Sequence, residues 1–273
     1  MLLILHFVEI LALLGGLAFA FYGLRLFFLQ SRIVFRPSRE IVASPRDCGL
    51  PFEDVMLGPA RGWWIPAKRA AKVILYLPGG IGNMSRELST LTWLSNLGVH
   101  VMAIDYPGYG QSSGRPSESG CYAAADAAWR FAVEQKGIAP QDVVIFGRSL
   151  GAAIAAHAAS QNECGALVIH SGVSSVPAVA ALRYPFLPVY FFCYIRFNTL
   201  KHLRRCNCPT LVMHSATDRV IPLRQGEEIF RAASSPKRFV KIPGDHYTNE
   251  WQAAPGLASE LRSLLFSKAE VQQ

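Results

Sequence analysis

The chain has 273 residues, a length typical of one sizeable domain with at most an appendage. Apolar residues make up 51% of it and charged residues 17%, so there are ample side chains for one large core. The formal net charge is +8, but no block of Lys and Arg with interleaved aromatic residues occurs, which argues against nucleic acid as a partner. On a protein tethered to a membrane, this basic balance indicates attraction to anionic lipid head groups.

A long apolar run occupies residues 2–24 and is interrupted only by His6 and Glu9. As a helix, the run would span a hydrocarbon core of roughly 30 Å. Residues 1–30 are therefore predicted to form a transmembrane anchor. The alternative is a cleaved signal peptide, because residues 18–20 resemble a cleavage site, but the run is long for a signal peptide and no basic region precedes it.

The charges around this run predict its orientation. Basic residues follow the run and none precedes it, so the positive-inside tendency places the main domain on the cytoplasmic side of the membrane. The residues concerned are Arg25, Arg32, Arg36 and Arg39. Residues 31–52, which are punctuated by Pro and Arg, are interpreted as a linker.

Residues 53–273 are predicted to form an α/β domain in which apolar strands alternate with helices. Strands are expected at 53–57, 63–65, 72–77, 99–106, 143–146, 166–170, 210–214 and 238–242. Helices are expected at 86–97, 122–135, 151–161, 224–233 and 255–266. The first two strands read as an antiparallel pair. The rest indicate a mostly parallel sheet with helices on both faces.

A five-residue motif, Gly-Arg-Ser-Leu-Gly, lies at 147–151 between a predicted strand and an alanine-rich helix. Gly-x-Ser-x-Gly in this setting is typical of a nucleophile elbow, a tight turn that exposes the serine at the end of the sheet. Gly147 and Gly151 leave room for the turn, and the start of the helix offers backbone N–H groups near Ser149. The alternative is an ordinary turn whose glycines serve packing.

Residues 171–208 break the alternation of strands and helices with a long apolar stretch, which includes Tyr-Pro-Phe-Leu-Pro-Val-Tyr-Phe-Phe-Cys-Tyr at 184–194. This stretch is too long for a plain crossover between two strands. We interpret it as a cap over the serine that lines an acyl pocket, rests on the bilayer, or does both. The alternative is a buried crossover helix.

A serine becomes a strong nucleophile only when a base takes its proton and a third group orients that base. In folds with this elbow, the order along the chain is Ser, then Asp or Glu, then His. Asp218 follows the strand at 210–214 and His246 follows the last strand, so both lie at the carboxyl ends of strands, where sites form. Ser149, Asp218 and His246 are therefore the candidate catalytic residues.

Other acids and histidines fit this role less well. Asp245 would point away from its neighbour in an extended loop, and Asp105 is expected to brace its own turn. Three further histidines lie in helix, cap or strand-end contexts and are expected to serve packing. They are His157, His170 and His202.

The oxyanion that forms when the serine attacks a carbonyl needs preorganised donors. We expect these to be the backbone N–H groups of Leu150 and of Gly80, which lies in the loop after the strand at 72–77, with Ile81 as the second choice. The alternative is that the glycines of this loop only permit a turn. The sequence contains no cluster with metal-ligand spacing and no phosphate-binding glycine loop, so neither a metal nor another cofactor is expected.

Four segments taken in order carry a resemblance to a known family. They are Asp-Tyr-Pro-Gly-Tyr-Gly-Gln-Ser-Ser-Gly-Arg-Pro-Ser at 105–117, the motif at 147–151, His-Ser-Ala-Thr-Asp-Arg-Val-Ile-Pro at 214–222 and Lys-Arg-Phe-Val-Lys-Ile-Pro-Gly-Asp-His at 237–246. Together they resemble the α/β-hydrolase superfamily, and within it the branch of membrane-anchored, depalmitoylase-like serine hydrolases. The resemblance covers roughly residues 50–267 and implies Ser149, Asp218 and His246 as the charge-relay residues.

The chain departs from this branch in two loops and at its N-terminus. The branch usually has His-Gly-Asn-Ala-Gly in the oxyanion loop, where this chain has Pro-Gly-Gly-Ile-Gly at 78–82. The branch also usually has Asp-Gly between its first two strands, where this chain has Gly-Pro-Ala-Arg-Gly at 58–62. The cysteine-rich lipid anchor of the protein-depalmitoylating members is absent, which weakens the transfer of their substrate.

These features predict a serine hydrolase that cleaves carboxylic ester or thioester bonds through an acyl-enzyme intermediate, as an esterase, thioesterase or lipase does. Small or lipid-derived acyl molecules are the expected substrates, because both the anchor and the apolar cap favour them. Two alternatives stay open. One is a catalytically inactive α/β-hydrolase scaffold that binds a lipid or protein partner, suggested by the altered oxyanion loop. The other is a serine peptidase of the same fold.

Ser149→Ala is expected to abolish labelling by a fluorophosphonate while leaving the fold intact, because the probe needs an activated serine hydroxyl. In-gel fluorescence of the labelled wild-type and variant chains measures the effect. Undiminished labelling of the variant would refute the assignment of Ser149.

Overall fold

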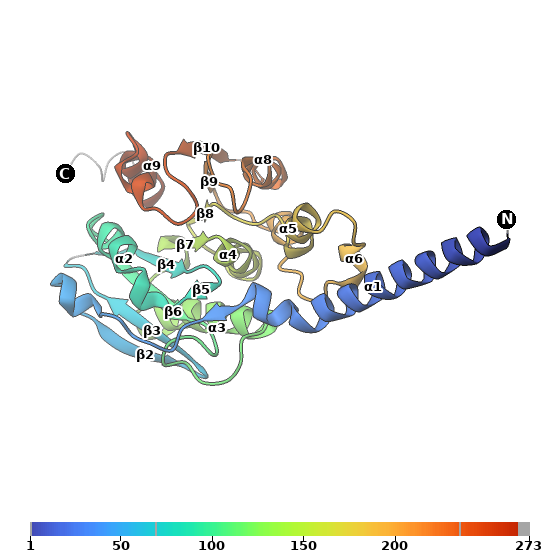
Figure 1. Ribbon diagram of the computed structural model, residues 1–273. Helices are drawn as coiled ribbons and strands as arrows, with labels where there is room; N and C mark the ends of the chain where they lie inside the picture. Colours follow the sequence, from blue (N-terminus) through green and yellow to red (C-terminus); the bar gives the residue numbers. More distant parts are fainter. Residues whose placement is uncertain (1, 69, 235, 267–273) are drawn as a thin grey trace.

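The computed structural model describes residues 2–68, 70–234 and 236–266. Its centre is an eight-stranded sheet in the order β10-β9-β8-β7-β4-β6-β3-β2 (Figure 1). The strands are β2 (Glu53–Leu57), β3 (Ala60–Ile65), β4 (Val73–Leu77), β6 (His100–Asp105), β7 (Val143–Arg148), β8 (Ala166–His170), β9 (Thr210–Ser215) and β10 (Lys237–Ile242). β3 runs antiparallel to β2 and β6, and the other neighbours are parallel. The predicted, mostly parallel α/β sheet is confirmed.

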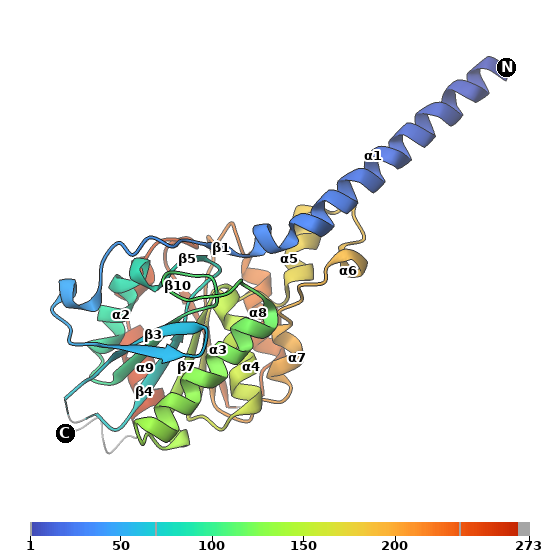
Figure 2. The same cartoon turned by 90° about the horizontal axis from the view of Figure 1, so that it is seen from below.

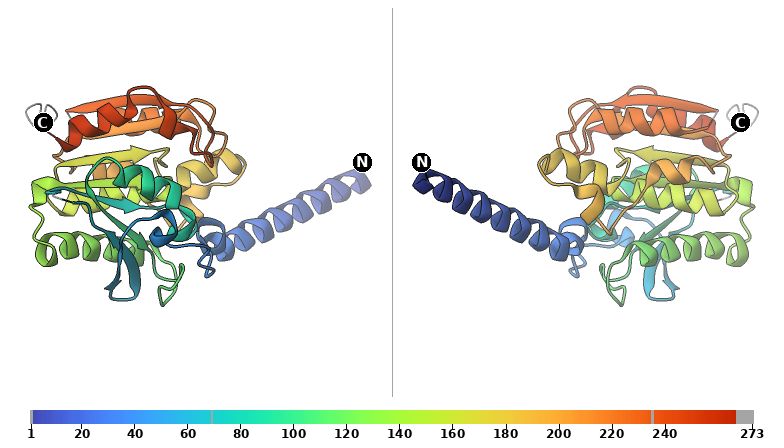
Figure 3. Two further views of the ribbon diagram at one scale, coloured as in Figure 1. Left: turned by 90° about the vertical axis from the view of Figure 1, so that its left-hand side faces the viewer. Right: turned by 90° about the vertical axis from the view of Figure 1, so that its right-hand side faces the viewer.

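Helices cover both faces of this sheet (Figure 3). They are α2 (Leu88–Ser95), α3 (Glu118–Arg130), α4 (Leu150–Gln161), α7 (Thr199–Leu203), α8 (Leu223–Ala232) and α9 (Leu257–Leu265). Successive strand side chains point to opposite faces, so Leu75 packs toward α3 and α4, whereas Ile74 packs toward α2 and α9. Both faces of the central strands are therefore buried, which explains why these strands are continuous apolar runs.

All five predicted helices begin one to four residues from the predicted positions, and capping side chains lie at or just before two of these starts. α3 begins at Glu118, four residues early, because the Ser117 hydroxyl caps it by accepting a hydrogen bond from the N–H of Gly120. α2 begins at Leu88, after a 3₁₀ turn at Met84–Arg86 that the Asn83 side chain caps. A side-chain cap thus sets the start of α3, whereas α2 starts after the capped 3₁₀ turn without a side-chain cap of its own.

The insertion between β8 and β9 is not a single cap. Its first part contains α5 (Val176–Arg183) and α6 (Val189–Phe192), which lie beside the N-terminal helix in two perpendicular views (Figures 1 and 2). Its last part contains α7, whose Leu203 is fully buried in the core that α4 also lines. The stretch at 171–208, predicted to be one cap, therefore has two parts. Its last part is a buried crossover helix, as the alternative interpretation predicted.

The N-terminal helix α1 (Leu2–Val34) projects from the domain as a long rod (Figure 2). It is long and apolar enough to cross a membrane. The helix continues past the boundary predicted at residue 30. Residues 31–52 also differ from a free linker, because Phe35 is buried in the core and β1 (Arg36–Pro37) pairs in parallel with β5 (Ile81–Gly82). The segment that leaves α1 thus packs against the loop after β4.

The sheet and α4 approach each other closely at two glycines. A side-chain carbon at Gly151 would collide with the carbonyl oxygens of Leu77 and Pro78, and one at Gly147 would collide with the backbone of Gly151. The colliding atoms belong to backbone and cannot rotate away. Only glycine therefore permits the turn from β7 into α4 at this distance from β4.

Gly151→Ala is expected to lower the free energy of unfolding by about 1–3 kcal/mol or more, because the added methyl group overpacks the turn. Thermal unfolding of the detergent-solubilised chain would show a midpoint several degrees lower. Gly16→Ala is the matched control, since a side-chain carbon at Gly16 meets nothing within 4 Å. Equal midpoints for the two variants would contradict the close-approach argument.

Candidate active site

Ser149 sits alone between β7, which ends at Arg148, and α4, which begins at Leu150. Its backbone has φ 54° and ψ −116°, a conformation that costs energy for a residue with a side chain. Its N–H donates to the carbonyl of His170 at 2.9 Å, which ties the turn to β8. The strained turn projects the hydroxyl beyond the ends of the strands, as expected for an elbow.

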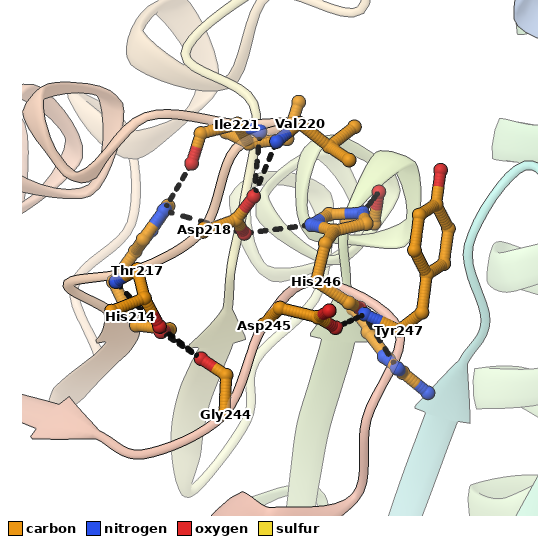
Figure 4. Close-up of polar contacts among 12 residues, drawn as sticks. His214, Thr217, Asp218, Val220, Ile221, Gly244, Asp245, His246 and Tyr247 are labelled. Atoms are coloured by element: carbon orange, nitrogen blue, oxygen red, sulfur yellow. Dashed lines mark hydrogen bonds and ion pairs between the residues drawn. The ribbon is translucent and has the colours of Figure 1, made fainter.

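The structure brings the three predicted residues together from three separate loops. The Oγ of Ser149 lies 2.9 Å from Nε2 of His246. Nδ1 of the same ring lies 2.7 Å from Oδ2 of Asp218 (Figure 4). With the ring proton on Nδ1, this nitrogen donates to the carboxylate and Nε2 accepts from the serine. The arrangement suits transfer of the serine proton to the imidazole.

The surroundings of Asp218 keep its carboxylate charged. Burial alone would raise its pKa, but the hydrogen bond and charge of His246 oppose this, as do N–H donors from Ile221 at 2.8 Å and Val220 at 2.9 Å. The balance holds the pKa of Asp218 below its usual value. A charged carboxylate at this position accepts the hydrogen bond from Nδ1 of His246 and so orients the ring.

His214, which the sequence analysis did not single out, supports the loop of Asp218. Its Nε2 donates to the carbonyl of Ile221 at 2.8 Å (Figure 4). Burial lowers the pKa of His214, which favours the neutral ring. The hydroxyls of Ser215 and Thr217 both donate to the carbonyl of Gly244, which joins the loops after β9 and β10.

Arg148, the variable residue of the motif before the serine, is a second residue that the sequence analysis missed. Its guanidinium is buried, pairs with Oε2 of Glu87 at 2.9 Å and donates to the carbonyl of His246 at 3.1 Å. The hydroxyl of Tyr76 donates to the same Glu87 oxygen at 2.8 Å. A planar guanidinium makes both contacts at once, so it links the elbow to the backbone of the histidine loop.

The two residues expected to donate to an oxyanion lie close to Ser149. Within the described part of the chain, the N–H groups of Leu150 and Gly80 donate no hydrogen bond. The adjacent Gly79 lies against Ser149, where a side-chain carbon would be 3.4 Å from the serine Cβ. Both predicted donors therefore border the serine.

The unusual oxyanion loop is held in place by two buried tyrosines. The hydroxyl of Tyr106 donates to the carbonyl of Pro78 at 2.8 Å, and the hydroxyl of Tyr109 donates to that of Gly80 at 2.9 Å. The N–H of Arg36 adds a second donor to Gly80 at 2.8 Å. These contacts support the loop although Pro78 stands where the resembled branch has His.

The two aspartates not chosen as the partner of His246 have other contacts. Asp245 accepts from the backbone N–H groups of Tyr247 and Thr248 within its own loop. Asp105 accepts from the N–H of Met84 at 2.7 Å and so braces the chain after the oxyanion loop. Neither carboxylate is hydrogen-bonded to the ring of His246.

The histidines set aside lie in packed positions. His170 is buried, and burial lowers its pKa well below the usual value. His157 stacks on Tyr122, with 4.0 Å between ring centroids, and His202 packs against both rings. In the described ranges, no group of three or more His, Cys, Asp and Glu side chains is placed to hold a metal ion.

An open pocket surrounds the serine hydroxyl. It is lined by Gly79, Gly80, Ile81, Glu87, Arg148, Ser149, His246 and Tyr247. As far as the structure describes the chain, this lining contains no residue of the insertion at 171–208. The predicted cap therefore lies beside the serine pocket instead of closing over it, because the insertion is attached to α1.

The chain matches known proteins in sequence and in fold. A family model described as the alpha/beta hydrolase fold matches residues 72–197. The uncharacterised protein Rv2307c of Mycobacterium tuberculosis is 32% identical over 225 residues, which cover 79% of this chain and 79% of that protein. The chain belongs to the α/β-hydrolase superfamily. The predicted superfamily is thus confirmed.

Two further similarities agree with this assignment. Human alpha/beta hydrolase domain-containing protein 17C is 33% identical over 133 residues, which cover 48% of this chain and 39% of that protein, and is consistent with the predicted branch. The Pyrococcus furiosus esterase Pf2001 superposes with a TM-score of 0.70 at 17% identity, covering 84% of this chain and 98% of that one. At this identity, the second similarity shows the fold.

The protonation of Asp105 is expected to make stability depend on pH. Burial raises its pKa to about 7 in the folded chain, against about 3.9 for an unfolded aspartate. The folded state then binds more protons between these values, so this stabilisation is complete below about pH 4 and is lost as pH rises through about 7.

Asp105→Asn removes this titration. The difference in unfolding free energy between wild type and variant is expected to change by roughly 4 kcal/mol across that range. Denaturant titrations of both chains, followed by tryptophan fluorescence from about pH 4 to about pH 8, measure it. A constant difference would contradict the raised pKa.

Proposed function

We propose that this chain is a membrane-anchored serine hydrolase that cleaves ester or thioester bonds of acyl substrates through an acyl-enzyme intermediate. The observation that carries the proposal is the hydrogen-bonded series from Ser149 through His246 to Asp218, at a strained turn beside two free backbone N–H groups. This combination supplies a nucleophile, its base, the group that orients the base, and oxyanion donors.

In the first half of the proposed reaction, the Oγ of Ser149 attacks the carbonyl carbon of the substrate while Nε2 of His246 takes its proton. Asp218 holds the ring in the required tautomer and stabilises the imidazolium. The N–H groups of Leu150 and Gly80 stabilise the negative oxygen of the tetrahedral intermediate. Its collapse breaks the carbon–oxygen or carbon–sulfur bond, and His246 returns the proton to the leaving alcohol or thiol.

In the second half, a water molecule replaces the leaving group. His246 takes a proton from this water as its oxygen bonds to the acyl carbon. The bond between that carbon and Oγ of Ser149 then breaks, and the proton returns to the serine. A carboxylic acid is released, and the chain regains its starting state.

A position at the membrane favours acyl molecules as the substrates of this site. α1 would hold the domain at a bilayer, where lipid-derived esters are concentrated. The arginines that follow the apolar run favour the cytoplasmic side, as the sequence analysis predicts. The two tyrosines that hold the oxyanion loop favour an active enzyme over a scaffold, because they preserve its backbone donors.

Hydrolysis of p-nitrophenyl acetate by the purified full-length chain tests the proposal. Asp218→Asn is expected to lower kcat by about 10⁴-fold, because the amide no longer fixes the ring tautomer of His246. The matched control is Asp54→Asn. Asp54 lies on β2 at the far edge of the sheet and bonds only the indole of Trp63, so wild-type turnover is expected.

A scaffold would behave differently in the same assay. A folded wild-type chain that neither hydrolyses the ester nor reacts with a fluorophosphonate would overturn the proposed function. Full turnover by Asp218→Asn would exclude the proposed role of this carboxylate.

A further inference from the structure

α1 divides into two parts with different surroundings. Residues 4–22 are exposed on all sides, and these 19 residues span roughly 28 Å, close to the thickness of a hydrocarbon core. From Gly23 onward, one side of the helix is covered, and Gly23 and Gln30 are buried. The bilayer boundary therefore falls near Gly23, where the helix meets the insertion.

Three residues of α1 fasten the insertion to the end of this helix. The side chain of Gln30 donates to the carbonyl of Phe192 at 2.8 Å and accepts from the N–H of Tyr194 at 2.9 Å. The ring of Phe27 contacts that of Tyr194, and Tyr22 contacts Tyr184. The tip of the insertion, residues 184–194, is thus held at the level of the bilayer boundary.

The composition of this tip suits a membrane interface. Phe186 is 89% exposed and Phe191 is 88% exposed, which is unfavourable in water but favourable among lipid head groups. Aromatic residues concentrate at membrane–water interfaces. Exposed Arg25, Arg183 and Arg196 lie on the same elements and can meet anionic head groups.

An apolar groove runs between α1 and the insertion. From α1 it is lined by Gly23, Phe27 and Val34, and from the insertion by Ala180, Leu187 and Val189, among others. Gln30 also lines the groove, but its side-chain amide is hydrogen-bonded to the backbone of the insertion. The groove therefore offers an apolar ligand a wall with few free polar groups.

The inner end of this groove adjoins the candidate active site. The carbonyl of Val34 lies against Gly80, where a side-chain carbon would be only 2.7 Å from it. The same carbon would lie 3.0 Å from the side chain of Leu150, the residue after Ser149. Val34 lines the groove and Gly80 lines the serine pocket, so the contact between these two residues separates the inner end of the groove from the pocket of Ser149.

We propose that this groove binds the acyl chain of a lipid-derived substrate that enters from the bilayer, with its carbonyl end toward Gly80 and Ser149. The chemistry at the carbonyl end rests on the proposed function, whereas binding of the chain does not. Each methylene group buried in the groove favours binding by about fourfold, so long chains are selected over short ones.

Gly23→Leu tests the groove with little risk to folding. A side-chain carbon at Gly23 meets nothing within 4 Å, and Leu favours a helix more than Gly does. The new side chain fills the groove. The ratio of p-nitrophenyl palmitate hydrolysis to p-nitrophenyl acetate hydrolysis is expected to fall at least about tenfold, since the burial of two or more methylene groups of the long chain is lost.

Gly16→Leu is the matched control. Gly16 precedes Gly23 by seven residues, close to two helical turns, so it lies on the same side of α1 but in the exposed part. It is expected to keep the wild-type ratio of palmitate to acetate hydrolysis. Equal ratios in the Gly23→Leu and Gly16→Leu variants would overturn the groove proposal while leaving the proposed function intact.

A second readout does not depend on turnover. A photoactivatable palmitic acid in phosphatidylcholine vesicles is expected to crosslink to residues 176–193 of the Ser149→Ala chain, and the added Gly23→Leu change is expected to remove the crosslink. Crosslinking in the groove without acetate hydrolysis by wild type would support the groove and overturn the proposed function. A crosslink that persists in the chain with the Gly23→Leu change would overturn the groove proposal.

Discussion

The close contact between the β7–α4 turn and the end of β4 is the constraint on which the site depends. Gly147 and Gly151 allow α4 to begin against the carbonyl groups of Leu77 and Pro78. This contact forces Ser149 into its strained conformation and places the first N–H of α4 beside the loop of Gly80. The nucleophile and both proposed oxyanion donors thus follow from one packing contact, and the core on both faces of the sheet balances its strain.

The acid and the base are held to this turn by separate polar contacts. Asp218 is oriented by the N–H groups of its own loop, and the histidine loop is tied to the elbow through Arg148 and the buried Glu87. A buried ion pair stabilises little in itself, because both charges lose their hydration. Its role here is positional: it places the backbone of His246 so that the ring reaches both Ser149 and Asp218.

α1 is a candidate membrane anchor that also packs against the domain. Residues 4–21 are exposed, as suits a bilayer, whereas the later part of the helix contacts the insertion through Tyr22, Phe27 and Gln30. Phe35 and β1 then carry the chain into the core and onto the oxyanion loop. The position of α1 relative to Ser149 is therefore set by rigid elements, which the interpretation of residues 31–52 as a linker did not anticipate.

The sequence by itself determined the strands, the elbow and the order Ser149, Asp218, His246, because apolar runs, glycine spacing and loop position are local properties of the chain. It also predicted Gly80 and Leu150 as oxyanion donors, and both residues lie near Ser149. Only the tertiary structure decided that Arg148 joins Glu87 to the histidine loop, that the insertion divides between core and membrane side, and that α1 forms half of a groove. These contacts join residues far apart, such as Gln30 and Phe192, which are separated by 162 positions. Local periodicity encodes which side chains are apolar, but the partner that covers each one is chosen only when the whole chain packs.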